Sequence, residues 1–165
     1  MRPAEYWIKH LQLLPHPEGG FYKETYRSNE SIQLSDLPSR FTAPRNFSTA
    51  IYFLLRSQDR SLFHRIKSDE LWHFHSGSVL QIYVLTRKGV NMLELGSDPE
   101  NGQSLQVTIP ANCWFGAKVT DPDTYVLSSC TVAPGFDFND FELADRQTLL
   151  KEFPDLHEII NDLTR

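Results

Sequence analysis

Short runs in which apolar and polar residues alternate fill most of the chain between residues 48 and 132. Turn-forming residues separate these runs, for example at Lys88-Gly89 and Asp121-Pro122-Asp123. The pattern predicts strands over residues 48–55, 61–67, 70–76, 79–86, 90–95, 104–109, 113–119 and 124–132. Many short strands at regular spacing are typical of an antiparallel sandwich or barrel, so we predict an all-β fold.

The two ends of the chain show helical periodicity instead. Apolar residues near the N-terminus recur at Tyr6, Trp7, Leu11 and Leu14. They predict a helix that starts near Pro3, because proline suits a first helical turn, and that Pro15 ends. Beyond Asp140, which we expect to be the N-cap of the first of them, apolar positions predict two short amphipathic helices packed on the barrel.

The segment between the N-terminal helix and the barrel divides into two parts. Residues 21–27 alternate aromatic and polar side chains and are predicted to form a strand. Residues 28–46 contain Ser, Pro and Arg with little periodicity, so a long loop is expected there. No internal repeat or linker divides the sequence. We therefore predict a single domain, residues 1–165, with a core that needs no disulfide or metal for stability.

Charge and composition exclude several classes of partner. The net charge of −5 and the scattered placement of the 16 Lys and Arg residues argue against nucleic-acid binding. No apolar run approaches the ~20 residues of a membrane span, and the N-terminus lacks the apolar core of a signal peptide. The only cysteines, Cys113 and Cys130, are expected to be free thiols in a reducing compartment. We expect a cytoplasmic protein with no nucleic-acid or membrane partner.

Two stretches concentrate the residues able to carry chemistry. The first, Phe63–Gly77, holds three histidines and two acids, and the second, Val107–Gly116, follows about one hairpin pair later. Together they resemble the two signature motifs of the cupin superfamily, whose fold is a double-stranded β-helix, or jelly roll. His64, Glu70 and Gly77 stand at the places of the second histidine, the glutamate and the glycine of the first motif.

Other motif positions are altered. Leu62 stands where the first histidine would be, Asn112 replaces a glycine, and Phe115 stands where the last histidine would be, although Pro110 matches the motif proline. Two of the four positions that usually ligate a metal are therefore kept.

More narrowly, the chain resembles a small single-domain cupin group of unknown function, the fifth cupin family. The stretches that carry this resemblance are His16–Ser28, Thr49–Leu55, Phe63–Gly77 and Gly135–Asp145. They span nearly the whole chain. The resemblance implies a dimeric barrel with a small-molecule pocket and no agreed activity. Residues 21–27 are the segment that we expect to cover a sheet edge of the partner in a homodimer.

Strand parity gives a separate test for a metal site, because side chains alternate between the two faces of a strand. If His64 and Glu70 face the barrel interior, His73 and His75 face outward, unless a β-bulge re-aims one of them. A catalytic metal site usually has three or more protein ligands, and the interior then offers only two. We therefore predict no metal and no cofactor.

Three functional hypotheses remain open. In the first, a metal-independent isomerase or epimerase acts on a small polar metabolite, such as a sugar or nucleotide derivative, with His64 as base and Glu70 orienting it. In the second, a metal-dependent oxygenase or isomerase uses His64 and Glu70 together with His73 or His75. In the third, the barrel is a non-catalytic module that binds a small molecule.

Six more residues are candidate ligand contacts. They are Glu24, Arg27, Ser48, Tyr52, Trp72 and Phe115. Glu24 and Arg27 lie in the predicted first strand, and the resemblance favours them. Ser48 and Tyr52 share one face of the next strand, where their hydroxyls would bind a ligand.

Overall fold

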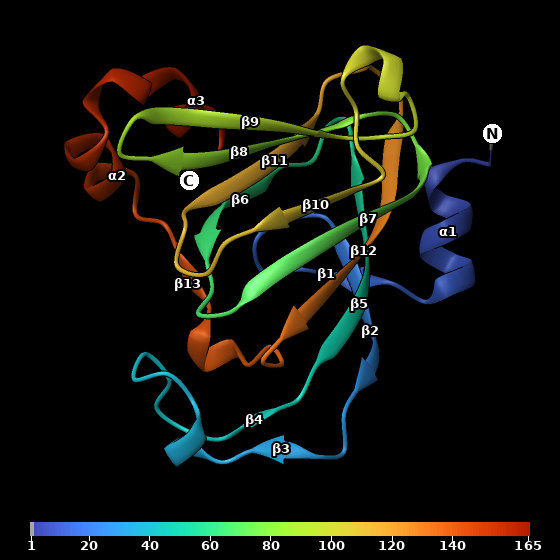
Figure 1. Cartoon of the computed structure of the whole chain (residues 1–165). Helices are drawn as coiled ribbons and strands as arrows, with labels where there is room; N and C mark the ends of the chain where they lie inside the picture. Colours follow the sequence, from blue (N-terminus) through green and yellow to red (C-terminus); the bar gives the residue numbers. More distant parts are fainter. Residues whose placement is uncertain (1) are drawn as a thin grey trace.

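The structure is a computed structural model and describes residues 2–165. Two antiparallel sheets face each other in a jelly-roll barrel, which confirms the predicted all-β fold (Figure 1). The first sheet has the order β1 (Leu14–Pro15), β2 (Phe21–Arg27), β5 (Thr49–Arg56), β12 (Tyr125–Ala133), β7 (Asp69–Gly77) and β10 (Gln106–Ile109). The second has the order β13 (Glu142–Leu143), β6 (Ser61–Arg65), β11 (Phe115–Val119), β8 (Leu80–Thr86) and β9 (Gly89–Leu95).

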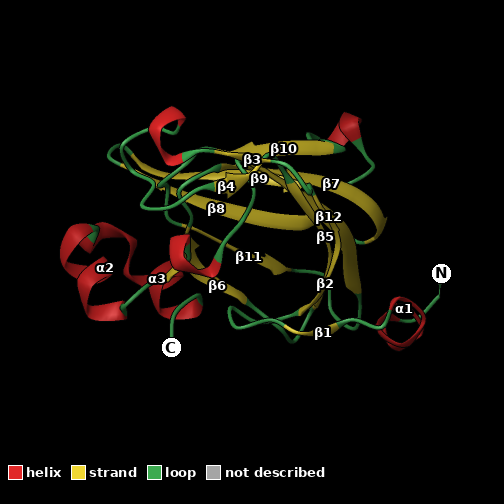
Figure 2. Cartoon of the chain, turned by 90° about the horizontal axis from the view of Figure 1, so that it is seen from below, coloured by secondary structure: helices red, strands yellow, loops and turns green. Residues whose placement is uncertain are grey.

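Helices cover the barrel from two sides. Figure 2 shows α1 (Ala4–Leu11) on one side of the sheets and α2 (Arg146–Glu152) with α3 (His157–Asp162) on the other. These are the predicted N-terminal helix and short C-terminal helices. Four 3₁₀ turns also lie in the part of the chain that the structure describes: Leu34–Asp36, Pro99–Asn101, Phe138–Asp140 and Pro154–Leu156. Within residues 2–165, no helix is long and apolar enough to cross a membrane.

The core consists of three clusters of buried side chains, and the apolar faces of the strands determine where each cluster lies. The largest cluster, around Phe53, Trp72 and Phe115, fills the space between the sheets. A second cluster packs α2 and α3 against Phe63 on the outer side of the second sheet. A third packs α1 against Leu54 on the outer side of the first sheet. Alternate residues of one strand therefore serve different clusters, as the two-residue period of a strand requires.

Three local predictions need correction. The N-terminal helix ends at Leu11 rather than at the proline, because Gln12 adopts a left-handed C-cap, and Pro15 lies in strand β1. The expected loop over residues 28–46 contains a small hairpin, β3 (Ser31–Ile32) with β4 (Arg45–Asn46).

The predicted helix cap is also displaced. The N-cap of α2 is Asp145, whose carboxylate accepts a hydrogen bond from the Thr148 amide at 2.9 Å. Asp140 instead lies buried in a bidentate ion pair with Arg45, with both N–O distances 2.6 Å. Asp140 lies in the Phe138–Asp140 turn, and α2 begins only at Arg146, so Asp140 is too far from the helix to cap it.

Candidate functional site

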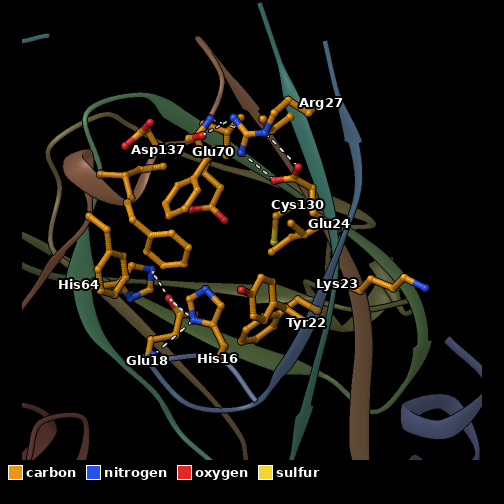
Figure 3. A pocket seen from close by; sticks show the side chains of 18 of the residues that line it. His16, Glu18, Tyr22, Lys23, Glu24, Arg27, His64, Glu70, Cys130 and Asp137 are labelled. Carbon is orange, nitrogen blue, oxygen red and sulfur yellow. Dashed lines mark hydrogen bonds and ion pairs between the residues drawn. The ribbon is translucent and has the colours of Figure 1, made fainter. Parts of the chain in front are cut away.

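A cavity of about 390 Å³ opens between the two sheets (Figure 3). Its walls come from β2, β5, β7 and β12 of the first sheet, from β6 of the second, and from the segment that follows β12. Six aromatic side chains line it: Tyr22, Phe53, Trp72, Phe136, Phe138 and Phe141. A concave, mostly apolar site with a few convergent polar groups is the usual form of a small-molecule pocket.

Strand alternation decides which polar groups reach this cavity. Glu70 and Trp72, two residues apart on β7, both line it, and Cys130 does so from β12. Trp72 is 1% exposed, and its indole nitrogen has no hydrogen-bond partner among the residues described. A buried N–H without a partner is rare in native proteins.

One end of the cavity is built on a buried pair, His64 and Glu18. The Nε2 atom of His64 lies 2.9 Å from a carboxylate oxygen of Glu18, and its Nδ1 atom lies 2.7 Å from the carbonyl oxygen of Leu62. Both ring nitrogens therefore face acceptors, which is the arrangement of an imidazolium. The other carboxylate oxygen of Glu18 accepts a hydrogen bond from the Ser61 hydroxyl at 2.8 Å.

The pKa shifts of this pair agree with an ion pair. Burial alone would lower the pKa of His64, but the charge and hydrogen bond of Glu18, with smaller effects of Glu70 and the Leu62 carbonyl, raise it above 6.5. Burial alone would raise the pKa of Glu18, but the charges of His64 and His16 and the hydrogen bonds from His64 and Ser61 lower it below 4.5. We conclude that His64 is charged and that Glu18 neutralises it.

His16 sits beside Glu18 and presents a free nitrogen to the cavity. Its side chain is 7% exposed, and its Nδ1 accepts the backbone N–H of Glu18 at 3.3 Å. Burial and the charge of His64 lower its pKa, although Glu18 acts in the opposite direction, so the ring is neutral at pH 7. The hydrogen then sits on Nε2, which has no hydrogen-bond partner within residues 2–165 and points into the cavity in Figure 3.

Glu70 points into the same cavity from the other side (Figure 3). Burial raises its pKa, the charge of His64 lowers it, Glu18 raises it further, and a hydrogen bond with Cys130 lowers it, with a net value of about 7. A carboxyl group with this pKa exists in both protonation states near neutral pH. Such a group is suited to taking and returning protons.

The mouth of the cavity carries a second ion pair, Arg27 with Glu24. The guanidinium donates to both carboxylate oxygens at 3.0 and 2.7 Å, and also to Asn46 Oδ1 and the Phe136 carbonyl at 2.9 and 3.0 Å. Four of the five N–H groups of Arg27 are thus used within the protein. Arg27 lines the cavity but serves mainly to fasten the segment after β12 to β2.

The structure places the other predicted contacts in different surroundings. Trp72 lines the cavity, whereas Phe115 lies behind it, with its ring centroid 4.1 Å from that of His64. Ser48 and Tyr52 do not line the cavity, because Thr49, Ile51 and Phe53 occupy the inner face of β5. The Ser48 hydroxyl donates to the Val132 carbonyl, and Tyr52 packs beneath α1.

His73 and His75 lie on the opposite face of β7 from Glu70. His73 contacts the Thr131 hydroxyl at 3.2 Å and the Gln106 amide at 2.9 Å, and His75 is exposed at a bulge in the pairing with β12. The bulge does not turn His75 into the cavity. The metal-dependent hypothesis requires one of these histidines to lie beside His64, and neither does.

Sequence reasoning missed His16 and Glu18. Both lie in the loop between β1 and β2, which the structure folds under the cavity so that Glu18, rather than Glu70, contacts His64. One signal was present, since Gly19 and Gly20 follow directly. Gly19 adopts φ +110°, and a Cβ there would lie 1.9 Å from the Arg60 carbonyl oxygen. A loop that must contain glycine at such a position and that carries His and Glu is a candidate site loop.

The barrel of two facing sheets, with His64 and Glu70 inside it, defines a cupin. The family described as Cupin_5, of the cupin superfamily (DUF985), matches residues 5–144, and the chain belongs to this family. A hypothetical protein from Leishmania major is 34% identical, with a TM-score of 0.91 and coverage of 99% of both chains. Protein SO0799 from Shewanella oneidensis is 38% identical, with a TM-score of 0.89, covering 100% of this chain and 99% of that one.

Two more comparisons give one further sequence relative and one protein that shares only the fold. The uncharacterized protein YML079W of Saccharomyces cerevisiae is 30% identical in an alignment 154 positions long that covers 87% of this chain and 76% of that protein. Oxalate decarboxylase from Bacillus subtilis is 13% identical with a TM-score of 0.53, and the match covers 90% of this chain and 36% of that one. At this identity, oxalate decarboxylase shares the barrel and nothing about chemistry follows.

The donor set does not fit the metal that cupin motifs commonly hold. Leu62 and Phe115 replace two ligands, and both ring nitrogens of His64 are already bonded within the protein. Within residues 2–165, no group of three or more His, Cys, Asp or Glu side chains is arranged to hold an ion. Three protein ligands are the usual minimum for a catalytic metal site, and the described residues do not supply them.

Proposed function

We propose that this protein binds a small polar metabolite, sugar-like or nucleotide-like, in the barrel cavity and catalyses an isomerase-type proton transfer on it. The observation that carries the proposal is Glu70, a buried carboxyl group inside an aromatic cavity, with a pKa of about 7 and with His16 facing it. A carboxyl group and an imidazole that face each other across a pocket are suited to general acid–base chemistry on a molecule held between them.

The catalytic roles of Glu70 and His16 follow from which of their polar atoms are not engaged by other protein groups. The Glu70 carboxylate takes a proton from a carbon next to a carbonyl group, and the C–H electron pair remains on the substrate as an enediolate. The Nε2–H of neutral His16 donates a hydrogen bond to the oxygen where this negative charge develops. Glu70 then returns the proton to the former carbonyl carbon, while the His16 Nε2 gives its hydrogen to the former carbonyl oxygen and takes the hydroxyl hydrogen from the adjacent oxygen. Composition and oxidation state are unchanged, so the step needs no oxidant or reductant.

His64 is assigned a positioning role in place of the role of base expected from the sequence. Its two ring nitrogens are engaged by Glu18 and the Leu62 carbonyl, so no lone pair is available to a substrate. Its charge fixes the Glu18 carboxylate, and the backbone of Glu18 in turn fixes the tautomer of His16. Removal of His64 would therefore act through His16.

Proton exchange with solvent tests the proposal directly. The protein is incubated in D₂O with a panel of aldoses and ketoses, and ¹H NMR records loss of carbon-bound hydrogen. We expect exchange at one carbon of at least one compound, and a loss of about 10²–10⁴-fold in its rate in Glu70→Gln. Glu142→Gln is the control, because Glu142 is exposed and pairs with Arg65 outside the cavity. Saturable binding without exchange of any compound would contradict catalysis and leave a binding module.

We also propose a cytoplasmic location. Cys113 and Cys130 are free, and Cys130 is buried beside Glu70, where burial and that carboxylate raise the pKa of its thiol. A reducing compartment keeps such thiols unmodified. Fluorescence microscopy of the tagged full chain would test this location.

A further inference from the structure

The charges that line the cavity are unequally paired. Carboxylates are contributed by Glu18, Glu24, Glu70 and Asp137, and basic side chains by His16, Lys23, Arg27 and His64. Each basic group that is charged either has a carboxylate partner in the protein or lies outside the cavity. Only charges that are not paired within the protein can attract or repel a charged ligand.

The basic groups leave no free positive charge inside. His64 is neutralised by Glu18, and Arg27 by Glu24 at 2.7 Å. Figure 3 shows Lys23 extending away from the cavity, and its ammonium group donates to Gln12 Oε1 at 3.0 Å. His16 is neutral at pH 7 because burial lowers its pKa.

Two of the acidic groups have no basic partner in the described part of the chain. Among residues 2–165, Glu70 and Asp137 have no ion-pair partner within 4.0 Å. Asp137 instead accepts the Asn139 backbone N–H at 2.8 Å at the start of the Phe138–Asp140 turn. The field inside the cavity is thus neutral to negative. An anionic ligand group would meet carboxylates at the mouth and Glu70 inside, with no cation to compensate them.

The polar groups of the cavity that have no partner among the described residues are suited to hydrogen bonds with hydroxyl groups. Carboxylates accept hydrogen bonds from hydroxyls, and the free Nε2–H of His16 donates to a hydroxyl or carbonyl oxygen. The six aromatic rings offer flat apolar walls to the C–H faces of a ring.

We infer that the cavity accepts an uncharged polyhydroxylated molecule, a free sugar, and discriminates against its phosphorylated form. This inference rests on the proposed function, because it names the substrate class of the same cavity. It narrows the sugar-like or nucleotide-like metabolite to the members that carry no phosphate. The pairing of Arg27 by Glu24 is the feature that sets this preference.

Matched pairs test the inference at equilibrium, without turnover. D-Glucose, D-ribose and D-fructose are each compared with their own monophosphate by saturation-transfer NMR and calorimetry on the full chain. We expect at least one neutral member to bind, and to bind at least about tenfold more tightly than its phosphate, a difference of about 1.4 kcal/mol. Tighter binding of the phosphates overturns the inference.

A variant separates charge selectivity from pocket shape. Glu24→Gln frees the Arg27 guanidinium and removes one negative charge, so the preference for the neutral member should shrink by about tenfold. Glu142→Gln unpairs Arg65 on a surface outside the cavity in the same way, and should leave the ratio unchanged. An unchanged ratio in Glu24→Gln contradicts the role assigned to this pair.

The two proposals fail in different experiments. Charge-selective binding without hydrogen exchange would contradict the isomerase and support the substrate class. Absence of binding by all three pairs would overturn the substrate class, and exchange on another kind of carbonyl compound would still support the isomerase.

Discussion

Glu70 keeps its proton to a pH at which an exposed glutamate has long been ionised. Its side chain lies in an aromatic cavity near Glu18, and burial is the largest cause of its raised pKa. The charge of His64 opposes this rise but does not cancel it, because Glu18 already neutralises His64. The value of about 7 is therefore a property of the three groups together.

The raised pKa makes a prediction about stability. Below pH 4.5 the Glu70 carboxyl is protonated in both the folded and the unfolded state. Between 4.5 and about 7 the unfolded chain loses this proton and the folded chain keeps it, so Glu70 makes the free energy of unfolding fall as pH rises. At about 1.4 kcal/mol per pH unit, the full loss above pH 7 is on the order of 3 kcal/mol. Glu70→Gln cannot ionise and escapes this loss.

Urea denaturation at pH 5 and pH 8 measures the effect. We expect Glu70→Gln to be more stable than the natural protein by up to about 3 kcal/mol at pH 8, with most of that gain absent at pH 5. Glu142→Gln changes the net charge equally at an exposed position and is the control. The same stability difference at both pH values would show that Glu70 ionises normally.

At the scale of elements, the site depends on the loop that joins β1 to β2. This loop carries His16 and Glu18, and its shape requires glycine at position 19. In Gly19→Ala a methyl group would lie 1.9 Å from the Arg60 carbonyl oxygen, on a backbone with φ +110°. The loop must then move away from β6 and carry Glu18 with it.

Gly89→Ala is the matched control, because Gly89 also has a positive φ, +120°, but a Cβ there meets nothing within 4 Å. We expect Gly89→Ala to lose only about 1–3 kcal/mol of stability, which is the cost of the backbone strain at this φ. We expect a larger loss of stability in Gly19→Ala and displaced ¹⁵N signals of His16 and His64 in NMR spectra. Equal losses in the two variants, with unchanged histidine signals, would mean that the loop tolerates the methyl group.

Elements whose signal is local could be predicted from the sequence. The strands after residue 48 follow from alternation and turn residues, and parity placed His73 and His75 on the outer face of β7. The partner of His64 could not be predicted, because Glu18 precedes it by 46 residues in a loop without periodicity. The ion pair of Asp140 with Arg45 could not be predicted for the same reason, because a contact between residues far apart in the sequence does not change the local pattern of apolar and polar residues.

At the scale of the whole molecule, one edge of the first sheet is incompletely covered. Strand β2 pairs with β5 on one side, while β1 pairs only with Phe21 and Tyr22 on the other. The remaining edge, from Lys23 to Arg27, carries Tyr26, which is 54% exposed. Open edges with exposed aromatic residues favour association with another strand. We propose that a second copy of the chain covers this edge in a homodimer.

Light scattering coupled to size-exclusion chromatography tests this proposal at micromolar concentration. The natural protein should elute as a dimer of about 38 kDa, twice the chain mass of 19.1 kDa. Tyr26→Lys places a charge on the β2 edge and should give a monomer, because lysine on an edge strand opposes pairing. Met92→Lys makes the same change at a residue 48% exposed on β9, the outer strand of the second sheet, and should remain a dimer. A monomer in Met92→Lys and a dimer in Tyr26→Lys would assign the interface to β9, and the cavity rim near β2 would then be open to solvent in the assembly.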